Sequence, residues 1–362
     1  MLFFAEKLCG LMSNRILKIK DIKYCFEPTM IGLIVTDECT ASCNNCCFNC
    51  SPKKGISMSL EDMKYYVNSG IENFKEIKTV VLTGGEPFLL GIKQLKDIIN
   101  HINKLNLRSR IVTNGFWATH SKTKEYICEL VASGLNEINF STGDEHQKFV
   151  NIENIINACI ESVKSGLTVA VNIESHEKSC FNINTLFENS LFKEFFSNQE
   201  NINKIKIVSG IWSSLNEDSN SYDYNLNNME LLKKRKKGCN SIFKSISILP
   251  SGEMTVCCGL TVTKIAHFKL GNVKTDNMKT LYETQYNCFI NLWLKMEGPY
   301  NILEYLALKE PRIKELHVNH SCQACNYLFN NEFVKETISK YYIEKIPEVL
   351  FKYQIQKKLN NF

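Results

Sequence analysis

Apolar and polar positions follow a regular order of short and long segments along the first part of the chain. Short apolar runs bounded by turn residues predict buried strands, and apolar positions that recur every three or four residues predict amphipathic helices. Strands are expected at 31–36, 79–82, 109–113, 137–141, 168–173 and 204–208. Helices are expected between them at 59–76, 92–105, 121–133 and 152–165. Ser59 with Asp62 is typical of a helix start, and Gly70, Gly134 and Gly166 stand where helices are expected to end.

This order of elements predicts an α/β fold. Repeated strand–helix units with short connections require a parallel sheet with right-handed crossovers. Six such units predict a partial (β/α)6 barrel of the TIM type, not a closed eight-fold one. Loops that follow parallel strands meet at one rim, where such folds bind ligands. Polar or thiol-bearing segments follow the predicted strands at 39–46, 84–86, 113–115, 141–144 and 172.

The character of the sequence changes after residue 209. The stretch 212–228 is rich in Ser, Asn, Asp and Tyr and lacks periodicity, which predicts a linker. Beyond it, 245–249 and 254–258 predict a β-hairpin. The expected organisation is an N-terminal extension at 1–27, a core at 28–210, a linker at 211–236, a smaller cysteine-rich domain at 237–330 and a helical tail at 331–362.

Composition narrows the class of protein. The chain has 362 residues, of which 44% are hydrophobic and 22% charged, and this predicts a globular protein with a large core. We find neither an apolar run of membrane-spanning length nor the basic start of a secretory signal, so we expect a cytoplasmic protein without membrane contact. A net charge of +5 does not indicate nucleic-acid binding. Sixteen cysteines without such a signal favour metal ligation over disulfides, and they suggest an anaerobic host.

The most informative residues are Cys39, Cys43 and Cys46, which directly follow a predicted strand. Three thiolates at this spacing can hold one face of a metal cluster and leave one metal corner without a protein ligand, where chemistry can take place. A structural zinc site is the alternative, but it requires a fourth ligand.

A second motif, Thr83-Gly-Gly-Glu-Pro87, follows the next predicted strand. Together the two motifs resemble the radical S-adenosylmethionine (radical SAM) enzymes over roughly residues 28–210. The resemblance implies a [4Fe-4S] cluster on the three cysteines, whose unique iron binds the methionine part of SAM, and release of a 5′-deoxyadenosyl radical on reduction. It also implies that the motif at Gly84, Gly85 and Glu86 receives the amino group of SAM, to which a carboxylate is suited.

Further polar residues at strand ends are candidate SAM contacts. They are Thr113, Asn114, Ser141, Asp144 and Asn172. Helix capping or turn formation accounts for each of them as well. Asp144 and His146 are alternative substrate contacts, and His146 is also typical of a packing histidine. The chain departs from many family members in having Asn45 where they place an aromatic residue, and Cys47 and Cys50 are expected to be free or packing thiols.

A second set of cysteines comprises Cys239, Cys257, Cys322 and Cys325. Its spacing, with Gly252 between the first two members, resembles the auxiliary-cluster domains called SPASM and, in shortened form, twitch. No cysteine follows Cys325, so the resemblance implies one auxiliary [4Fe-4S] cluster, with zinc as the alternative. Cys258 is left over beside this set. We hypothesise that it gives a hydrogen atom to a substrate radical, as in twitch-bearing peptide epimerases; exchange with Cys257 as ligand, or a buried thiol, are alternatives.

The resemblance implies an enzyme that abstracts a hydrogen atom from a ribosomally synthesised peptide. The product is then an epimerised residue, a dehydrogenated residue, or a thioether or carbon crosslink. A precursor peptide is the expected partner, with flavodoxin or ferredoxin as electron donor. Dehydrogenation of a small molecule is an alternative reaction. A non-catalytic iron–sulfur or zinc protein that binds a partner or senses oxygen is an alternative from another class, against which Glu86 and the polar rim argue.

Overall fold

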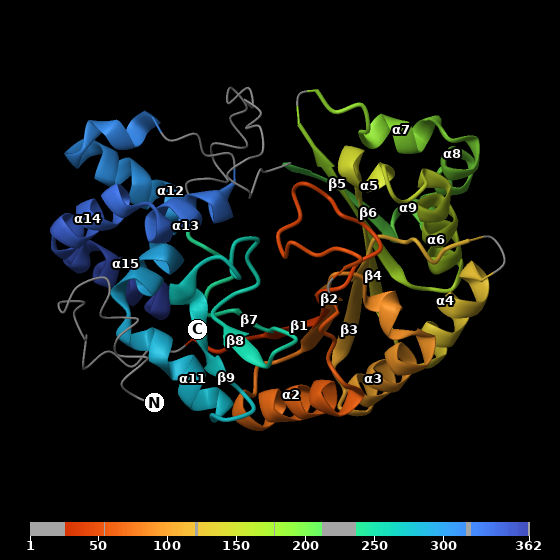
Figure 1. Cartoon of the computed structure of the whole chain (residues 1–362), viewed down its shortest axis with the longest axis horizontal. Coiled ribbons are helices and arrows are strands. Elements are labelled where there is room, and N and C mark those ends of the chain that lie inside the picture. Colours follow the sequence, from red (N-terminus) through yellow and green to blue (C-terminus); the bar gives the residue numbers. More distant parts are fainter. Residues whose placement is uncertain are drawn as a thin grey trace.

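The computed structural model describes residues 26–53, 55–119, 122–176, 178–211, 237–315 and 320–360. A curved sheet forms its centre, with helices along the outer side and loops on the concave side (Figure 1). The expected extension at 1–27, apart from its last two residues, lies outside the described residues. So does the expected linker at 211–236, apart from its first residue.

Six parallel strands form the first part of the sheet. They are β1 (Met30–Thr36), β2 (Thr79–Gly84), β3 (Arg108–Thr113), β4 (Glu137–Gly143), β5 (Thr168–Ser175) and β6 (Ile205–Ile211). Each strand pairs in parallel with the next, so that Leu33 lies opposite Leu82, for example, and Phe140 opposite Val171. The six predicted strands and the partial TIM-like α/β fold are therefore confirmed.

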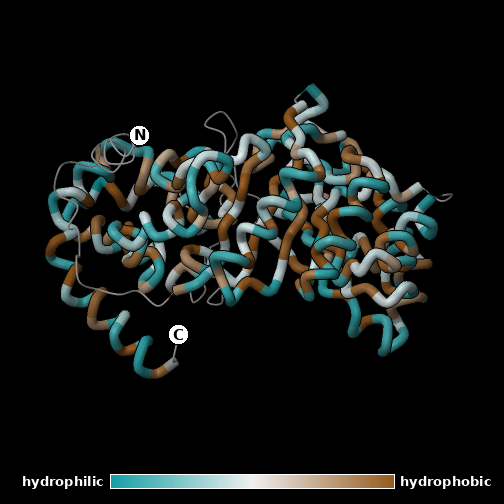
Figure 2. Tube along the Cα trace, turned by 90° about the horizontal axis from the view of Figure 1, so that it is seen from below, coloured by the Kyte–Doolittle hydropathy of each residue, from teal (hydrophilic) through white to brown (hydrophobic). Residues whose placement is uncertain are grey.

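Helices connect these strands and cover the outer face of the sheet. The longer ones are α2 (Leu60–Asn73), α3 (Ile92–Lys104), α4 (Thr123–Ala132) and α6 (Ile152–Lys164). The shorter ones are η2 (Pro87–Leu90), α5 (Asp144–Gln147), α7 (Ile183–Glu188), α8 (Ser190–Phe196) and α9 (Gln199–Ile202). Figure 2 shows hydrophobic and hydrophilic residues alternating along the helical segments, as expected for helices with one face on a core.

The start predicted for α2 is confirmed, because the Ser59 side chain accepts a hydrogen bond from the Asp62 amide at 3.0 Å. Gly134 and Gly166 follow their helices with φ of 100° and 89°, as a helix end of this type requires. The prediction for Gly70 is wrong, since this residue lies inside α2 and is buried. A Cβ at this position would overlap the Ile31 side chain, so the glycine allows close packing of α2 on β1.

Strand residues alternate between the core and the concave side of the sheet. On β4 and β5, Phe140 and Val171 are completely buried among the residues that pack against the outer helices. The intervening residues, such as Ser141 and Asn172, are only partly buried. Successive strand side chains point to opposite faces, so the second group is directed to the concave side.

The chain returns to the same sheet after the linker region. The strands there are β7 (Ser245–Ile248), β8 (Glu253–Thr255) and β9 (Lys269–Asn272). The predicted hairpin is confirmed by the antiparallel pairing of β7 with β8. In addition, β7 pairs in parallel with β1, so one nine-stranded sheet runs in the order β6-β5-β4-β3-β2-β1-β7-β8-β9. The sheet thus crosses the boundary expected at residue 237, and the division into domains stays a prediction.

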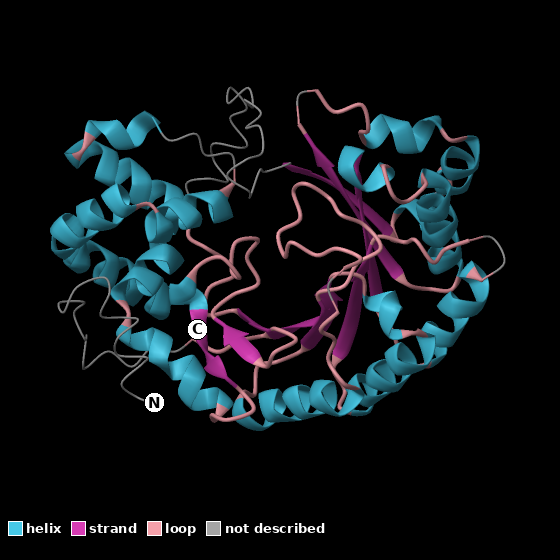
Figure 3. Ribbon diagram, in the orientation of Figure 1, coloured by secondary structure: helices cyan, strands magenta, loops and turns pink. Residues whose placement is uncertain are grey.

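The remaining helices gather at the other end of the molecule from α4 and α6 (Figure 3). They are α11 (Met278–Thr284), α12 (Phe289–Lys309), α13 (Ser321–Asn330), α14 (Glu332–Tyr341) and α15 (Ile346–Asn360). Short turns lie at η3 (Ala266–Phe268), η4 (Gln285–Asn287), η5 (Pro311–Glu315) and η6 (Tyr342–Lys345). Among the described residues, no helix has both the length and the apolar composition of a membrane span.

Candidate functional site

A cavity of about 370 Å³ opens on the concave side of the sheet. The inner faces of the strands line it, together with the loop after β1, the loop after β8 and His146 of α5. Predicted site residues that line it are Cys39, Cys43, Cys46, Gly84, Gly85, Thr113, Asn114, Ser141, Asn172 and Cys258. Of the predicted site residues, Glu86, Asp144, Cys239, Cys257, Cys322 and Cys325 are not among its lining.

The loop after β1 brings the first three thiols to this cavity. All three are free and partly buried. Main-chain amides point at two of the sulfurs, with Ala41 N 3.4 Å from Cys39 Sγ and Cys50 N 3.3 Å from Cys46 Sγ. Such amides stabilise thiolates, and three thiols open to one space are the donor set that a cluster with one free corner requires.

Burial and neighbouring groups shift the pKa values of all three thiols. Burial raises the pKa of Cys39 to about 11 and that of Cys43 to about 12, and neighbouring acids and thiols add to both shifts. The pKa of Cys46 is lowered to about 6, chiefly by a hydrogen bond from the Cys50 side chain. Because metals bind thiolates, the first two thiols must release protons when a cluster binds, and the positive metal compensates the charge that burial disfavours.

The end of β2 lies directly against the start of the cysteine loop. The Gly85 amide donates to the Thr36 carbonyl at 2.8 Å, and the Glu86 amide donates to the Glu38 carbonyl at 2.9 Å. A Cβ at Gly84, which has φ of 128°, would lie 2.5 Å from the Thr36 carbonyl oxygen, and one at Gly85 would overlap the Glu38 backbone. These glycines therefore admit a neighbouring backbone segment, in addition to lining the cavity.

The carboxylate of Glu86 does not face the cavity, contrary to the interpretation from the sequence. It is 0% exposed. It accepts hydrogen bonds from Thr113 Oγ1 at 2.7 Å, the Asn114 amide at 2.8 Å and the Phe88 amide at 3.1 Å. A carboxylate occupied in this way cannot reach an ammonium group in the cavity, so the side chain joins the ends of β2 and β3.

Asp144 is also directed away from the cavity. Its two carboxylate oxygens accept hydrogen bonds from the amides of Phe181 at 2.7 Å and Cys180 at 3.2 Å. Asp144 therefore orders the segment after β5, and a direct contact with SAM or substrate is not supported. Asn114 does reach the site, because its side-chain amide lies 3.0 Å from Thr40 Oγ1 and 3.7 Å from Cys39 Sγ.

The cavity is also lined by Asn45 of the cysteine loop and by His146 and Glu174. Asn45 donates from its amide to the Glu174 carboxylate, and His146 Nδ1 lies 4.0 Å from the same carboxylate. Burial lowers the pKa of His146, which favours its neutral form. The sequence analysis did not select Glu174, although it lies two residues after Asn172 on the same strand face, and the alternation of β5 would have indicated it.

The second set of cysteines lies in the part of the chain after β7. Cys257 follows β8, and Cys322 and Cys325 lie on α13. A Cβ at Gly259 would lie 3.3 Å from both Cys257 Sγ and Cys322 Sγ, so these two sulfurs are close to one another. The Gly259 and Leu260 amides point at them from 3.4 Å and 3.3 Å.

Cys239 and Cys325 belong to the same neighbourhood. Burial raises the pKa of Cys325, and the charges of Cys322 and Cys239 add to the shift. The four thiols thus influence one another electrostatically. Within the described residues, no three His, Cys, Asp or Glu side chains are placed to hold a single metal ion.

Cys258 differs from Cys257 in its exposure, although it lies close enough to add to the rise in pKa that burial causes at both Cys257 and Cys322. Cys257 is 6% exposed, whereas Cys258 is exposed and lines the cavity with Leu260 and Val262. Ser245 Oγ donates a hydrogen bond to the Cys258 sulfur at 3.3 Å. The leftover thiol therefore shares one space with the first three cysteines.

Comparisons with known proteins agree with this arrangement. Residues 33–176 match the profile of the radical SAM superfamily. A putative peptide biosynthesis protein of Bacillus subtilis (strain 168), YydG, is 30% identical over 135 residues, which are 37% of this chain and 42% of YydG. The match thus spans less than half the length of that relative.

Solved structures resemble the chain over most of its length. SuiB of Streptococcus suis bound to S-adenosylmethionine has a TM-score of 0.56 at 14% identity, covering 82% of this chain and 77% of SuiB. SuiB bound to the precursor peptide SuiA has a TM-score of 0.55 at 14% identity, covering 89% and 80%. The protein anSMEcpe with bound AdoMet has a TM-score of 0.52 at 13% identity, covering 91% and 96%. At these identities the likeness is one of fold.

The buried carboxyl of Glu86 should make stability depend on pH. Burial raises the pKa of Glu86 in the folded chain to about 7 from an ordinary 4.5. Between these values the folded chain holds a proton that the unfolded chain has released, so this contribution to stability is lost as pH rises from 4.5 to 7. At about 1.36 kcal/mol per pKa unit, the effect is on the order of 3 kcal/mol.

The variant Glu86→Gln does not titrate and should lack this part of the pH dependence. Its free energy of unfolding in urea is compared with that of the wild type at intervals between pH 4.5 and 8. The variant should also be destabilised at every pH, because the amide nitrogen that replaces one carboxyl oxygen faces an N–H or O–H donor and loses that hydrogen bond. Parallel curves for the two proteins would contradict the assignment.

Proposed function

We propose that this chain, whose residues 33–176 form a radical SAM domain, is an enzyme that modifies a peptide by removing a hydrogen atom. The observation that carries the proposal is a cavity that the cysteine loop, with Cys39, Cys43 and Cys46 and also Cys47 and Cys50, shares with the Cys258 thiol from the loop after β8. The printed name of the relative YydG, and the precursor peptide bound to SuiB, support a peptide as substrate.

Cys39, Cys43 and Cys46 would hold the [4Fe-4S] cluster of the domain. When bound, this cluster and SAM supply a 5′-deoxyadenosyl radical. The backbone of Gly84 and Gly85 would contact the SAM amino group, since the Glu86 side chain is buried. Further contacts are proposed for residues at the ends of the next strands, namely Thr113, Asn114, Ser141 and Asn172, all of which line the cavity.

The lining of the cavity would orient the substrate. Apolar side chains from β1, β3 and the loop after β8, including Ile34, Val112 and Val262, line the cavity beside the polar strand ends. A carbon radical formed there would lie in the same cavity as the Cys258 thiol. A shared cavity suits transfer of a hydrogen atom from the Cys258 thiol to the substrate radical, because both partners are held close together.

We propose that Cys258 completes an epimerisation. Its S–H bond breaks as a hydrogen atom passes to the substrate carbon radical, a C–H bond forms on the face opposite to the one that was attacked, and a sulfur radical remains. One electron and one proton then restore the thiol, with a low-potential protein such as flavodoxin or ferredoxin as the electron source. A crosslink would instead require the substrate to lose a second electron.

The four cysteines Cys239, Cys257, Cys322 and Cys325 would hold one auxiliary [4Fe-4S] cluster. Two of their sulfurs accept main-chain hydrogen bonds, which is the environment of a thiolate ligand. In this proposal Cys257 belongs to the auxiliary set, while its neighbour Cys258 lines the cavity. A cluster there could accept an electron if the product were oxidised.

Replacement of Cys39, Cys43 and Cys46 together by alanine should abolish SAM cleavage. The reconstituted variant should lose about four iron atoms per chain, the content of one cluster. Iron content, electron paramagnetic resonance with and without SAM, and 5′-deoxyadenosine formation are measured anaerobically. Cys159→Ala, at a buried cysteine on α6, is the matched control and should keep all three signals. Full SAM cleavage by the triple variant would rule out the proposal.

Replacement of Cys258 by alanine should stop epimerisation and leave SAM cleavage. Short peptides encoded beside the gene are incubated in deuterated water, and deuterium per product is determined by mass spectrometry. The wild type should incorporate one deuterium per epimerised residue, because a thiol exchanges its hydrogen with solvent. The variant should form at least 100-fold less of the epimerised product, since the Cys258 S–H bond supplies the hydrogen of that product. Loss of two hydrogens without deuterium in the wild-type product would indicate crosslinking or dehydrogenation.

A further inference from the structure

Cys239 reaches the auxiliary set from a segment that is separate in sequence from the other three cysteines. This segment, 237–240, precedes β7, whereas Cys257 follows β8 and the remaining two lie on α13. The Cys239 amide donates a hydrogen bond to the Leu294 carbonyl of α12 at 2.8 Å. This hydrogen bond ties the backbone at Cys239 to a carbonyl group of α12.

Helix α12 is interrupted there. Gly298 has φ of 80° and ψ of 163°, which is not helical, and Pro299 follows it. The last four carbonyls before a helix end have no partner within the helix, and proline cannot donate to the carbonyl four residues earlier. The turn from Leu294 to Glu297 is such an end. Its Leu294 carbonyl accepts from Cys239, and its Glu297 carbonyl accepts from the Asn301 side chain.

Two glycines let the backbones of the segment and the turn come into contact. A Cβ at Gly298 would overlap the carbonyl oxygen of Lys237, and a Cβ at Gly238 would overlap the carbonyl oxygen of Lys295. Gly298 also has the positive φ that other residues rarely adopt. Any side chain at either position would push the segment away from α12, and Cys239 with it.

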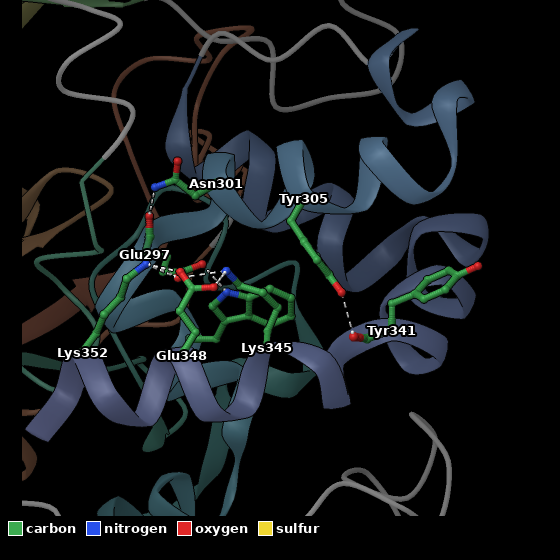
Figure 4. A network of polar contacts seen from close by, with 8 residues as sticks. Glu297, Asn301, Tyr305, Tyr341, Lys345, Glu348 and Lys352 are labelled. Atoms are coloured by element: carbon green, nitrogen blue, oxygen red, sulfur yellow. Dashed lines mark hydrogen bonds and ion pairs between the residues drawn. The ribbon is translucent and has the colours of Figure 1, made fainter.

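The other side of the turn is held by a buried charge. The Glu297 side chain is only 5% exposed, and it accepts a hydrogen bond from Trp293 Nε1 at 2.7 Å. Two lysines contact the same carboxylate, Lys345 at the end of η6 at 3.2 Å and Lys352 of α15 at 2.5 Å (Figure 4). A buried charge is costly to leave unpaired, so these contacts hold the broken turn in place against α15.

We propose that the broken turn of α12, residues 294–299, is the element that positions Cys239 as a ligand of the auxiliary cluster. The inference rests on the auxiliary cluster of the proposed function. It assigns Gly238 and Gly298 to the backbone contact, and Glu297 to the attachment of the turn to α15. None of these three residues touches the substrate or SAM in this proposal; each is a positioning residue.

The variant Gly298→Ala tests the proposal without a substrate. The full-length chain is reconstituted anaerobically, and iron per chain is measured together with the paramagnetic resonance of the reduced protein with and without SAM. The wild type should hold about eight iron atoms, from two clusters of four. The variant should hold about four and keep the signal that responds to SAM. Cys239→Ala is the reference for loss of the auxiliary cluster alone.

Gly166→Ala is the matched control. Gly166 also has positive φ, at 89°, but an added Cβ there meets nothing within 4 Å. This variant has a similar backbone strain without the overlap, and it should keep both clusters.

A milder variant decides the case if Gly298→Ala loses both clusters through general unfolding. Glu297→Gln adds no atom to the turn but weakens its attachment to α15, and it should lower the auxiliary signal at least twofold at constant SAM-responsive signal. Glu332→Gln, which removes an exposed ion pair with Lys335, should change neither signal.

Three results would overturn the proposal. The first is a full auxiliary signal in Gly298→Ala, and the second is a full auxiliary signal in Glu297→Gln where Gly298→Ala does not fold. In both cases the proposal of an auxiliary cluster remains valid if Cys239→Ala loses the auxiliary signal. The third is a Cys239→Ala variant that keeps about eight iron atoms, which would refute the assignment of this ligand and the positioning role together.

Discussion

The backbone contact between the end of β2 and the start of the cysteine loop is the constraint on which the rest of the site depends. Two glycines without side chains allow this contact, and hydrogen bonds from the Gly85 and Glu86 amides to the Thr36 and Glu38 carbonyls hold it. The buried Glu86 carboxylate extends it to β3 through Thr113 and Asn114. Three strand ends are thereby fixed with respect to the loop that carries the first thiols.

Parallel pairing of β7 with β1 has a comparable effect on the second half of the site. Because this pairing places the hairpin beside the first strand, the loop after β8 faces the same cavity as the loop after β1. Thr263 Oγ1, 3.5 Å from the Cys47 carbonyl, marks where the two loops meet. The first three cysteines and Cys258 therefore line one cavity, although the chain between them forms most of a barrel.

Close contact of backbones recurs where a cysteine has to be held. Gly84 and Gly85 permit it beside the first set, and Gly238 and Gly298 permit it beside Cys239. In each case a carbonyl oxygen occupies the place of a missing Cβ. Since a backbone segment has few ways to move without breaking its hydrogen bonds, such contacts hold a neighbouring thiol more firmly than a flexible side chain could.

Much of the fold was predictable because its signals are local. Buried parallel strands have short apolar runs, and their helices have an apolar stripe, so all six core strands were found. The hairpin of β7 and β8 was found from its turn residues. Gly70 was misjudged because its role is set by Ile31 on a different element, and nothing in its neighbouring residues indicates that contact.

The site was only partly predictable for the same reason. Glu86 and Asp144 were expected to contact SAM or substrate. Whether a carboxylate faces a cavity depends on whether main-chain amides of distant segments donate hydrogen bonds to it. Glu174 was overlooked although the alternation of β5 indicates its direction. His146, on the short helix α5, lies near the Glu174 carboxylate of β5, which no local pattern reveals.

The sequence by itself determined the order of the strands and helices, the spacing of the first three thiols and the presence of a second cysteine set, since all of these are properties of neighbouring residues. Only the tertiary structure decided that Cys257 is buried while Cys258 lines the cavity, that Glu86 is enclosed, and that the Cys239 amide bonds to the Leu294 carbonyl of α12. The physical reason is that orientation and burial arise from contacts between segments far apart in the chain, whose partners are set by packing.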